Sequence, residues 1–286
     1  MTIRQALDTA ARQLAKAGVD SPRLNAQLLL ASLLNTPHLQ LMTMQGSPLE
    51  ATVEARFFKL VARRASREPL QTILGYAHFM GHAFLTAPDV LIPRQDTETL
   101  CERALSHVHP GSRVLDLCCG SGCLAISIKL AQPEAAVYAS DISAAAIALT
   151  QRNALRLGAT ITPYQGDLFV PFAGMRFDVI LSNPPYIPLS EMPGLQEEVR
   201  QEPALALEAG PDGLLFYRRI LKEAAQHLKP GGHLLLELGD SQAAAVSALV
   251  PHGFSQPLIH MDLAGLPRVL ETRYMEGVSS SYERLF

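Results

Sequence analysis

Apolar positions near the start of the chain recur with the period of α-helices. Three helices are predicted: the first is bounded by Thr2 and Gly18, the second runs from Pro22 to about Leu34, and the third from Leu49 to about Ala65. The second and third each follow a Ser-Pro pair. Serine is a common helix cap, and proline fits the first helical turn, so this pair typically starts a helix. We expect a small helical domain over residues 1–74.

The pattern changes after Pro69. Residues 76–80 and 82–85 have the character of strands, with Gly81 between them, which predicts a β-hairpin. We expect this hairpin to serve as a linker over residues 75–92. A helix predicted over residues 98–107 then leads into a second domain.

From Arg113 onward, short apolar runs alternate with helical patterns. Strands are predicted at 114–117, 137–140, 161–164, 177–181 and 233–238, and helices at 124–130, 144–157 and 214–228. Alternation at this spacing is typical of βαβ units, in which helices cover both faces of a parallel sheet. Two further strand-like runs between 254 and 273 predict an antiparallel edge. We therefore expect an α/β domain over residues 93–276 and a flexible tail over residues 277–286.

The overall composition excludes some classes of protein. Hydrophobic residues make up 48% of the chain and charged residues 18%, and the formal net charge is −3. The slightly negative net charge argues against a protein that binds nucleic acid mainly through its phosphates. No apolar run is long enough to cross a bilayer, and the N-terminus lacks the apolar block of a secretory signal. We expect a protein of a soluble, reducing compartment, with neither DNA nor a membrane as partner.

Basic side chains gather at the end of the third predicted helix. They are Lys59, Arg63, Arg64 and Arg67. One interpretation is a solvated C-terminal turn, where positive charge suits the helix dipole. The alternative is a docking patch for an acidic partner or RNA.

All four cysteines lie in one short part of the chain: Cys101, Cys118, Cys119 and Cys123. A secreted disulfide framework would spread them more widely. A zinc site normally contains a C-x-x-C pair or a nearby histidine, and both are missing here. Reduced, packed thiols are the favoured interpretation, and no metal site is predicted.

A glycine-containing loop follows the first strand of the α/β domain. Its residues are Cys118, Cys119, Gly120, Ser121 and Gly122. Ligands of open parallel sheets bind beyond the carboxyl ends of the strands, and glycine lets a ligand approach the backbone closely. Such a loop is weak evidence by itself, because dinucleotide enzymes use a similar one.

Acidic residues follow the next two strands. Asp141 ends the second strand, 21 residues after Gly120, where a carboxylate can accept both hydroxyls of a ribose. The alternative is that Asp141 caps the next helix. Asp167 follows the third strand. It could accept from an adenine amino group while Leu168 supplies a backbone amide and an apolar wall, or it could be an ordinary loop aspartate.

The fourth strand is followed at once by Asn183, Pro184, Pro185 and Tyr186. The prolines stiffen the backbone and remove two N–H donors, which leaves carbonyl oxygens available. The Asn183 side chain can also accept a hydrogen bond, and Tyr186 offers a flat face. Two acceptors placed together fit the two hydrogens of an NH₂ group. The alternative is an ordinary proline turn.

This pattern indicates a specific chemistry. The lone pair of a planar amide nitrogen is delocalised, so the nitrogen is a poor nucleophile. Hydrogen bonds from both of its N–H groups raise its electron density and orient it toward a sulfonium methyl group. The alignment of the nitrogen with the methyl group and the electrostatic effect of the acceptors would then account for the rate, without a strong general base.

The Asn-Pro-Pro-Tyr segment resembles the motif of methyltransferases that act on exocyclic or amide nitrogens. Further segments resemble the release-factor glutamine methyltransferase family (PrmC, also called HemK). These are Glu68-Pro69-Leu70-Gln71, Leu74-Gly75, Val90 to Arg94, Asp96-Thr97-Glu98, Glu198 to Pro203, Ala206-Leu207, Asp212-Gly213-Leu214, Tyr217-Arg218 and Pro230-Gly231-Gly232. The resemblance covers roughly Leu24 to Arg273, and the motifs are specific in combination.

The resemblance implies a helical N-terminal domain that recognises the substrate, a hairpin and a Rossmann-like class I methyltransferase domain. It implies that S-adenosylmethionine, which leaves as S-adenosylhomocysteine, contacts the loop from Cys118 to Gly122, Asp141, Leu168 and Asn183. It also implies that the segment from Asn183 to Tyr186 carries catalysis and holds a glutamine. In this family that glutamine lies in the Gly-Gly-Gln motif of class 1 peptide chain release factors, whose methylation at N5 modulates translation termination.

The sequence departs from the family pattern at several positions. The family usually has glycine where Cys118 stands, threonine at Cys119 and proline at Gln95. If the turn at Cys118 needs a positive φ, that residue is strained. Arg94 and Glu98 could reach the amino-acid end of the cofactor, or could form a salt bridge at the start of a helix.

Three other functions compete with this one. The sister family PrmB methylates a ribosomal-protein glutamine, but the linker from Ile92 to Glu98 favours the release factor. An adenine-N6 nucleic-acid methyltransferase would have to flip its base into the site, and the acidic balance disfavours it. A non-catalytic nucleotide- or RNA-binding module would not need the intact Asn-Pro-Pro-Tyr segment.

Overall fold

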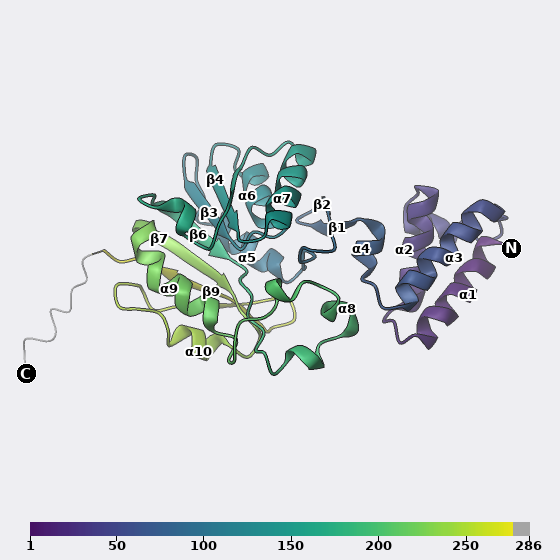
Figure 1. Ribbon diagram of the computed structural model, residues 1–286. Coiled ribbons are helices and arrows are strands. Elements are labelled where there is room, and N and C mark those ends of the chain that lie inside the picture. Colours follow the sequence, from purple (N-terminus) through teal and green to yellow (C-terminus); the bar gives the residue numbers. More distant parts are fainter. Residues whose placement is uncertain (277–286) are drawn as a thin grey trace, which may run out of the picture. The chain divides into compact units, whose positions relative to one another are not determined.

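The computed structural model describes residues 1–276, which form two compact units (Figure 1). Unit 1 comprises Met1–Tyr76 together with Gln196–Gln201, and unit 2 comprises the remaining described residues. The chain therefore contributes to unit 1 twice. The predicted flexible tail, residues 277–286, lies outside the described residues.

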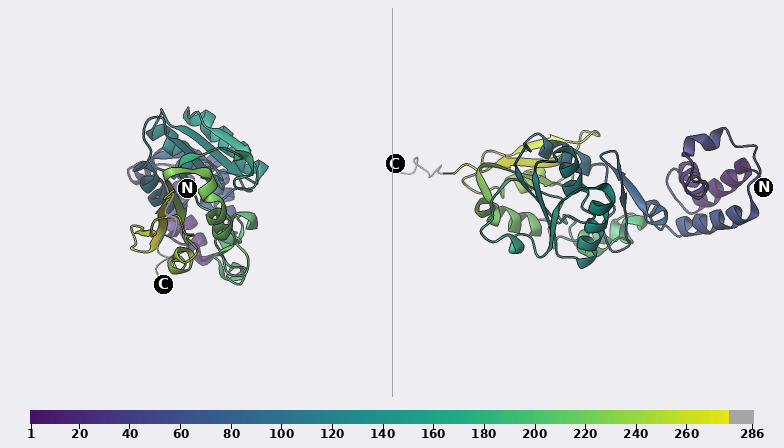
Figure 2. Two further views of the ribbon diagram at one scale, coloured as in Figure 1. Left: turned by 90° about the vertical axis from the view of Figure 1, so that its left-hand side faces the viewer. Right: turned by 90° about the horizontal axis from the view of Figure 1, so that it is seen from above.

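Unit 1 is a bundle of helices (Figure 2). It has an apolar core of its own. Its elements are α1 (Ile3–Lys16), α2 (Pro22–Leu34), the 3-10 helix η1 (His38–Met42), α3 (Ala51–Ala65), α4 (Leu70–Leu74) and α8 (Glu197–Arg200). A capping box formed by Thr2 and Gln5 starts α1, as the sequence predicts. The amphipathic stripe of α1 packs into the core through Ala6, Ala10 and Leu14.

Two details of the predicted helix starts are wrong. Ser21 precedes α2, but its backbone is left-handed and its side chain makes no capping hydrogen bond. Helix α3 begins at Ala51, after Glu50, rather than at Leu49. Leu49 is instead part of the apolar core, so burial of this side chain takes precedence over the local Ser-Pro start signal.

The basic end of α3 is not a simple solvated turn. Arg64 is 6% exposed and donates to Glu198 Oε1 at 2.8 Å, and Arg67 donates to Glu198 Oε2 at 2.6 Å. Arg64 also donates to the Asn25 side chain at 2.8 Å. Hydrogen bonds from Arg67 and Arg64 lower the pKa of Glu198 against the opposing effect of burial. These bonds fix the segment 196–201 within unit 1, so the two arginines serve an internal role.

Unit 2 contains a seven-stranded sheet within the described residues, in the order β5-β4-β3-β6-β7-β9-β8. Its strands are β3 (Arg113–Leu117), β4 (Ala136–Asp141), β5 (Thr162–Gln165), β6 (Phe177–Ser182), β7 (Leu228–Glu237), β8 (Leu258–Met261) and β9 (Pro267–Arg273). The first five run parallel, whereas β9 is antiparallel to both β7 and β8. The predicted α/β architecture with an antiparallel edge is confirmed.

Helices cover both faces of this sheet. Helices α5 (Thr97–Leu105), α6 (Cys123–Ala131) and α7 (Ala144–Leu157) pack on one face. The other face carries α9 (Leu215–His227), α10 (Ala243–Ser247) and the 3-10 helix η2 (Val170–Phe172). Successive side chains of β3 alternate between the two cores, with Val114 in one and Leu115 in the other. Burial on both faces accounts for the nearly continuous apolar runs of these strands.

The predicted hairpin is also confirmed, as β1 (Tyr76–Phe79) and β2 (His82–Leu85). The long connection from β6 to α9 holds the short 3-10 helices η3 (Met192–Gly194) and η4 (Ala204–Ala206), as well as α8. Across the described range, no helix is both long enough and apolar enough to cross a membrane.

Candidate functional site

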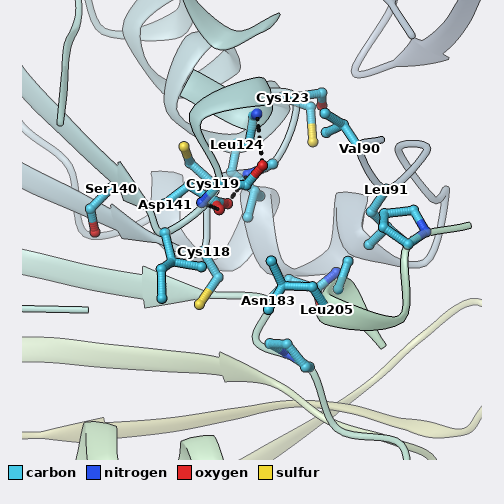
Figure 3. Close-up of a pocket in the computed structure, with 18 of the residues that line it drawn as sticks. Val90, Leu91, Cys118, Cys119, Cys123, Leu124, Ser140, Asp141, Asn183 and Leu205 are labelled. Carbon is cyan, nitrogen blue, oxygen red and sulfur yellow. Dashed lines mark hydrogen bonds between the residues drawn. The ribbon is translucent and has the colours of Figure 1, made fainter. Parts of the chain in front are cut away.

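The site lies where three neighbouring strands end. Parallel pairing aligns Leu117 of β3 with Ser140 of β4 and with Ser182 of β6. The residues that follow are Cys118, Asp141 and Asn183, so register alone brings them together at one edge of the sheet. Figure 3 shows these three side chains around the same pocket.

Most of the predicted site residues line this pocket. They are Cys118, Cys119, Gly120, Ser121, Asp141, Asp167, Leu168, Asn183 and Pro185. Gly122, Pro184 and Tyr186 do not belong to the lining. Gly122 has a packing role instead, because a Cβ there would lie 2.8 Å from the Thr150 side chain.

The Asn-Pro-Pro-Tyr turn is anchored from behind. The Tyr186 carbonyl accepts a hydrogen bond from the Gln242 side chain at 2.9 Å. Gly213, with a φ of +73°, packs so closely that an added Cβ would lie 2.4 Å from the same carbonyl oxygen. Beyond the turn, the Ile187 N–H donates to the Leu207 carbonyl at 2.9 Å. The turn is thus held rigidly by contacts that leave Asn183 at the pocket wall.

Asp141 uses one oxygen for each of two backbone N–H groups. Oδ2 accepts from Gly120 at 2.9 Å, and Oδ1 accepts from Ser143 at 2.9 Å. The cap of α7 is the Ser143 side chain, which accepts from the Ala146 N–H, so Asp141 itself is not the helix cap. Burial raises the pKa of Asp141, and the two N–H bonds oppose this rise. Each oxygen retains further acceptor capacity for a ligand.

Asp167 and Leu168 form the next part of the wall. Asp167 Oδ2 pairs with Arg219 of α9 at 2.6 Å. Leu168 has a φ of +48°, and its carbonyl accepts from the Ser140 hydroxyl at 3.1 Å. Asp167 is therefore more than a loop residue, because its ion pair joins the strand end to a helix that also lines the pocket.

Cys118 adopts the left-handed conformation, with a φ of +58°. This is the positive φ that was expected to strain a residue with a side chain. Among residues 1–276 all four cysteines are free thiols, and burial raises the pKa of Cys118, Cys119, Cys123 and Cys101. At neutral pH they are thus neutral packing groups, as predicted.

The Asn183 amide is oriented by a buried chain of polar groups. Its Nδ2 donates to the Thr97 hydroxyl oxygen at 3.2 Å. Thr97 is 2% exposed and hydrogen-bonds in turn to the Glu237 side chain. A hydroxyl that donates to a carboxylate keeps its lone pairs for Nδ2. The amide oxygen of Asn183 is then the atom left to accept from a ligand.

Glu237 itself is an unusual group. It is 1% exposed, and its Oε2 has no hydrogen-bond partner among the described residues. Burial raises its pKa to about 7, and the Thr97 hydroxyl bond opposes this rise. Sequence analysis missed this residue, because it lies at the end of β7 without any motif that marks it.

Arg94 and Glu98 were also considered as candidates for contacts with the cofactor, and both bond to other residues of the protein. Arg94 lines the pocket and forms an ion pair with Glu202. Glu202 also accepts from the Ile92 N–H at 2.9 Å through its other oxygen. Glu98 does not line the pocket and instead accepts from the Met80 N–H at 2.6 Å.

Several apolar wall residues were also missed. They are Val90, Ile92, Ile142, Leu205, Ala206 and Phe216. They come from the linker, the loop after β4, the β6–α9 connection and α9. Val90, Ile92 and Ala206 lie in segments that resemble the family, but nothing in the sequence assigned them to the pocket. Ile142, Leu205 and Phe216 belong to no such segment, and only the fold identifies them.

Comparisons with known proteins match both parts of the chain. Residues 5–75 match the family model "PrmC N-terminal domain", and residues 95–202 match "Methyltransferase small domain". A protein named release factor glutamine methyltransferase from Geobacter sulfurreducens is 44% identical over 95% of this chain and 96% of its own length. One of the same name from Moorella thermoacetica is 45% identical over 87% of this chain and 89% of its own length.

One solved structure supports the fold. The crystal structure of a methyltransferase from Pyrococcus furiosus superimposes with a TM-score of 0.53 and 17% identity, covering 79% of this chain and all of its own. At this identity the likeness concerns the fold alone. Together with the sheet order, it identifies a class I methyltransferase fold in unit 2.

The strained turn yields a first prediction. Cys118→Gly should keep the fold and bind cofactor within about threefold of the original chain, because glycine adopts a positive φ freely. Cys118→Val should lose about 2 kcal/mol of stability, because β-branched residues resist this conformation. Urea unfolding and calorimetric titration with cofactor measure both. Cys101→Val is the matched control, since Cys101 lies in a regular helix. Equal destabilisation by both valines would contradict a conformational cause.

The orientation of Asn183 yields a second prediction. Thr97→Val removes the acceptor of its Nδ2, whereas Thr97→Ser keeps the hydroxyl. We expect the valine variant to lower kcat by about 10- to 100-fold, the equivalent of one buried polar group losing its partner, with cofactor affinity nearly unchanged. The serine variant should restore most of kcat. If valine and serine variants lost activity equally, the hydroxyl would not be the positioning group.

The buried carboxylate yields a third prediction. The pKa of Glu237 is raised in the folded protein, from 4.5 to about 7, so the folded state holds this proton more tightly than the unfolded state. Its contribution to stability is present below pH 4.5 and is lost as the pH rises to about 7. Relative to Glu237→Gln, the original chain should therefore lose about 3 kcal/mol across this range. Urea unfolding from pH 4 to 8 measures the difference, and parallel pH profiles would refute it.

Proposed function

We propose that this chain, which belongs to the release factor glutamine methyltransferase family, methylates the side-chain amide nitrogen N5 of a glutamine in a class 1 peptide chain release factor. The activity is that of an S-adenosylmethionine-dependent methyltransferase. The observation that carries the proposal is the oriented amide of Asn183 at the end of β6, beside the ends of β3 and β4.

The polar and apolar groups that line the pocket are suited to binding S-adenosylmethionine. Asp141 offers carboxylate oxygens that retain acceptor capacity for ribose hydroxyls. Ile142, Leu168 and Phe216 supply apolar surface for a planar base, and Asp167 offers an acceptor for an amino group. A Cβ added at Gly120 would be in van der Waals contact with the Val90 side chain at 3.9 Å, so the glycine leaves this part of the pocket open to a ligand.

Bound S-adenosylmethionine supplies an electrophilic methyl group on a sulfonium. The residues of the chain would prepare the nucleophile. Asn183 Oδ1 and a backbone carbonyl of the proline turn would each accept one N–H of the glutamine amide. Both bonds raise electron density on the nitrogen and fix its direction of approach. As the N–C bond forms, the S–C bond would break and S-adenosylhomocysteine would leave. The nitrogen would then give one proton to water, so that the product is a secondary amide.

The positions of the prolines support this arrangement. Pro184 and Pro185 lack N–H groups and hold φ near one value, so the turn cannot relax toward internal hydrogen bonds. Tyr186 follows with a half-buried ring, against which a planar amide could pack. The anchoring of the Tyr186 carbonyl by Gln242 keeps the turn from moving when substrate binds.

Unit 1 is proposed to recognise the release factor. Its surface includes apolar side chains that are well exposed, with Leu39 at 65% and Met42 at 61% on η1. These two neighbouring side chains offer apolar surface that a protein partner could cover. We further propose that the protein acts as a monomer in the bacterial cytoplasm, with the Gly-Gly-Gln motif as the methylated segment and with neither DNA nor a membrane as partner.

A methyl-transfer assay tests the substrate. The protein is incubated with methyl-labelled S-adenosylmethionine and, separately, with a class 1 release factor, a ribosomal-protein substrate candidate and duplex DNA. We expect label on the release factor, and loss of that label when the glutamine of its Gly-Gly-Gln motif is changed to alanine. Asn183→Ala should cut turnover far more than cofactor affinity.

Two results would overturn the proposal. Label only on the ribosomal protein or on DNA would assign a different substrate. Equal loss of turnover and cofactor affinity in Asn183→Ala would make this residue a cofactor-binding group rather than one that orients the amide.

A further inference from the structure

A cluster of histidines surrounds one carboxylate at the antiparallel edge of the sheet. His233 of β7 pairs in register with Arg273 of β9, and His260 of β8 pairs with Val269. Glu271 lies two residues from each of these partners on β9. Since side chains alternate along a strand, register places His233, Glu271 and His260 on the same face. The turn after α5 adds His107.

The donor atoms of this cluster converge. His107 Nε2 lies 2.8 Å from Glu271 Oε1, and His233 Nδ1 lies 3.2 Å from the same oxygen. The donor atoms of His107, His233 and Glu271 all lie within 4.8 Å of one another. His260 Nε2 contacts the other carboxylate oxygen at 2.9 Å. Two ring nitrogens therefore face one oxygen while a third histidine holds the carboxylate from its far side.

The rings of His107 and His233 stack in the absence of an ion, with centroids 3.7 Å apart and an angle of 15° between planes. The lone pair of an imidazole nitrogen lies in the plane of its ring, so one tetrahedral ion requires the two stacked rings to turn until both lone pairs point at it. The ligand atoms already lie within 4.8 Å of one another, so turning the side chains is enough and the backbone can stay in place.

The donor set suits a divalent cation, because it combines two imidazole rings with one carboxylate. A divalent ion needs the free lone pairs of neutral imidazole and the negative charge of the carboxylate, and this cluster provides both.

We propose that His107, His233 and Glu271 form a binding site for a divalent transition-metal ion of the zinc class. His260 positions the carboxylate through its second oxygen, as outer groups do in metal sites. This contrasts with the expectation from sequence, which predicts no metal site and considers only the cysteines. His107 lies more than 100 residues before the other donors, so no spacing motif marks the site.

The site is separate from the methyltransferase pocket, because none of its four residues lines that pocket. Its position gives it a structural role: one ion would join the turn after α5 to two strands of the sheet edge. Methyl transfer should therefore continue without the ion, and the site should be measured by binding and stability.

Zinc titration of the untagged, full-length protein tests the proposal. Calorimetry with zinc chloride alone should give one ion per chain, and zinc at about 100 times Kd should raise Tm by roughly 5 °C or more. His107→Gln and His233→Gln should each weaken binding at least tenfold. His252→Gln is the matched control, because His252 is exposed and lies outside the cluster, and it should bind like the original chain. Absence of stoichiometric binding, or equal affinity in all three variants, would overturn the proposal.

Binding of Co²⁺ to the original chain provides a second test that does not depend on the histidine variants. Tetrahedral Co²⁺ bound by nitrogen and oxygen gives visible absorption bands, whereas thiolate ligands add an intense near-ultraviolet band. We expect the visible bands without the thiolate band in the original chain. A thiolate band of full stoichiometry would assign the ion to the cysteines and refute the proposed site.

Discussion

The alignment of three parallel strand ends is the constraint on which the rest of the site depends. Leu117, Ser140 and Ser182 share one level across the sheet, and each is followed directly by a site residue. A shift of one residue in any pairing would move that strand's functional residue and turn its side chain to the other face. Apolar burial on both faces makes such a shift costly, so the two cores that stabilise the fold also determine where Cys118, Asp141 and Asn183 lie.

The polar groups behind the pocket fix the direction of the Asn183 amide without placing a charged group next to it. Glu237 is buried behind the pocket wall and reaches Asn183 only through the Thr97 hydroxyl. The hydroxyl orients the Asn183 amide, and it carries no net charge itself. Burying a carboxylate that lacks one partner destabilises the folded state. Its retention in the core is consistent with a positioning role rather than a role in stability.

Much of this arrangement is predictable from sequence because its signals are local. The strands and helices of unit 2 follow from periodicity, and the loop residues Cys118 to Gly122 and the turn at Asn183 follow from their place after strands. The Thr97–Glu237 link and the Arg94–Glu202 ion pair were not predicted. Their partners are distant in sequence, and side-chain pairing across that distance depends on packing that no local pattern encodes. The second helix begins at Pro22 as predicted, although Ser21 makes no capping hydrogen bond. The third helix begins two residues later than predicted, and Leu49 is buried in the core of unit 1 instead.

The return of the chain to unit 1 has a consequence for any attempt to dissect the protein. Cutting the chain after Tyr76 would yield a fragment that keeps Glu198 but lacks Arg64 and Arg67, the cations that neutralise it. The complementary fragment would hold two arginines with no carboxylate between them, one of them buried. Neither piece keeps both partners of these ion pairs, although the family models divide the chain near this point. In sequence, unit 1 is therefore discontinuous, with part of unit 2 inserted between its two segments.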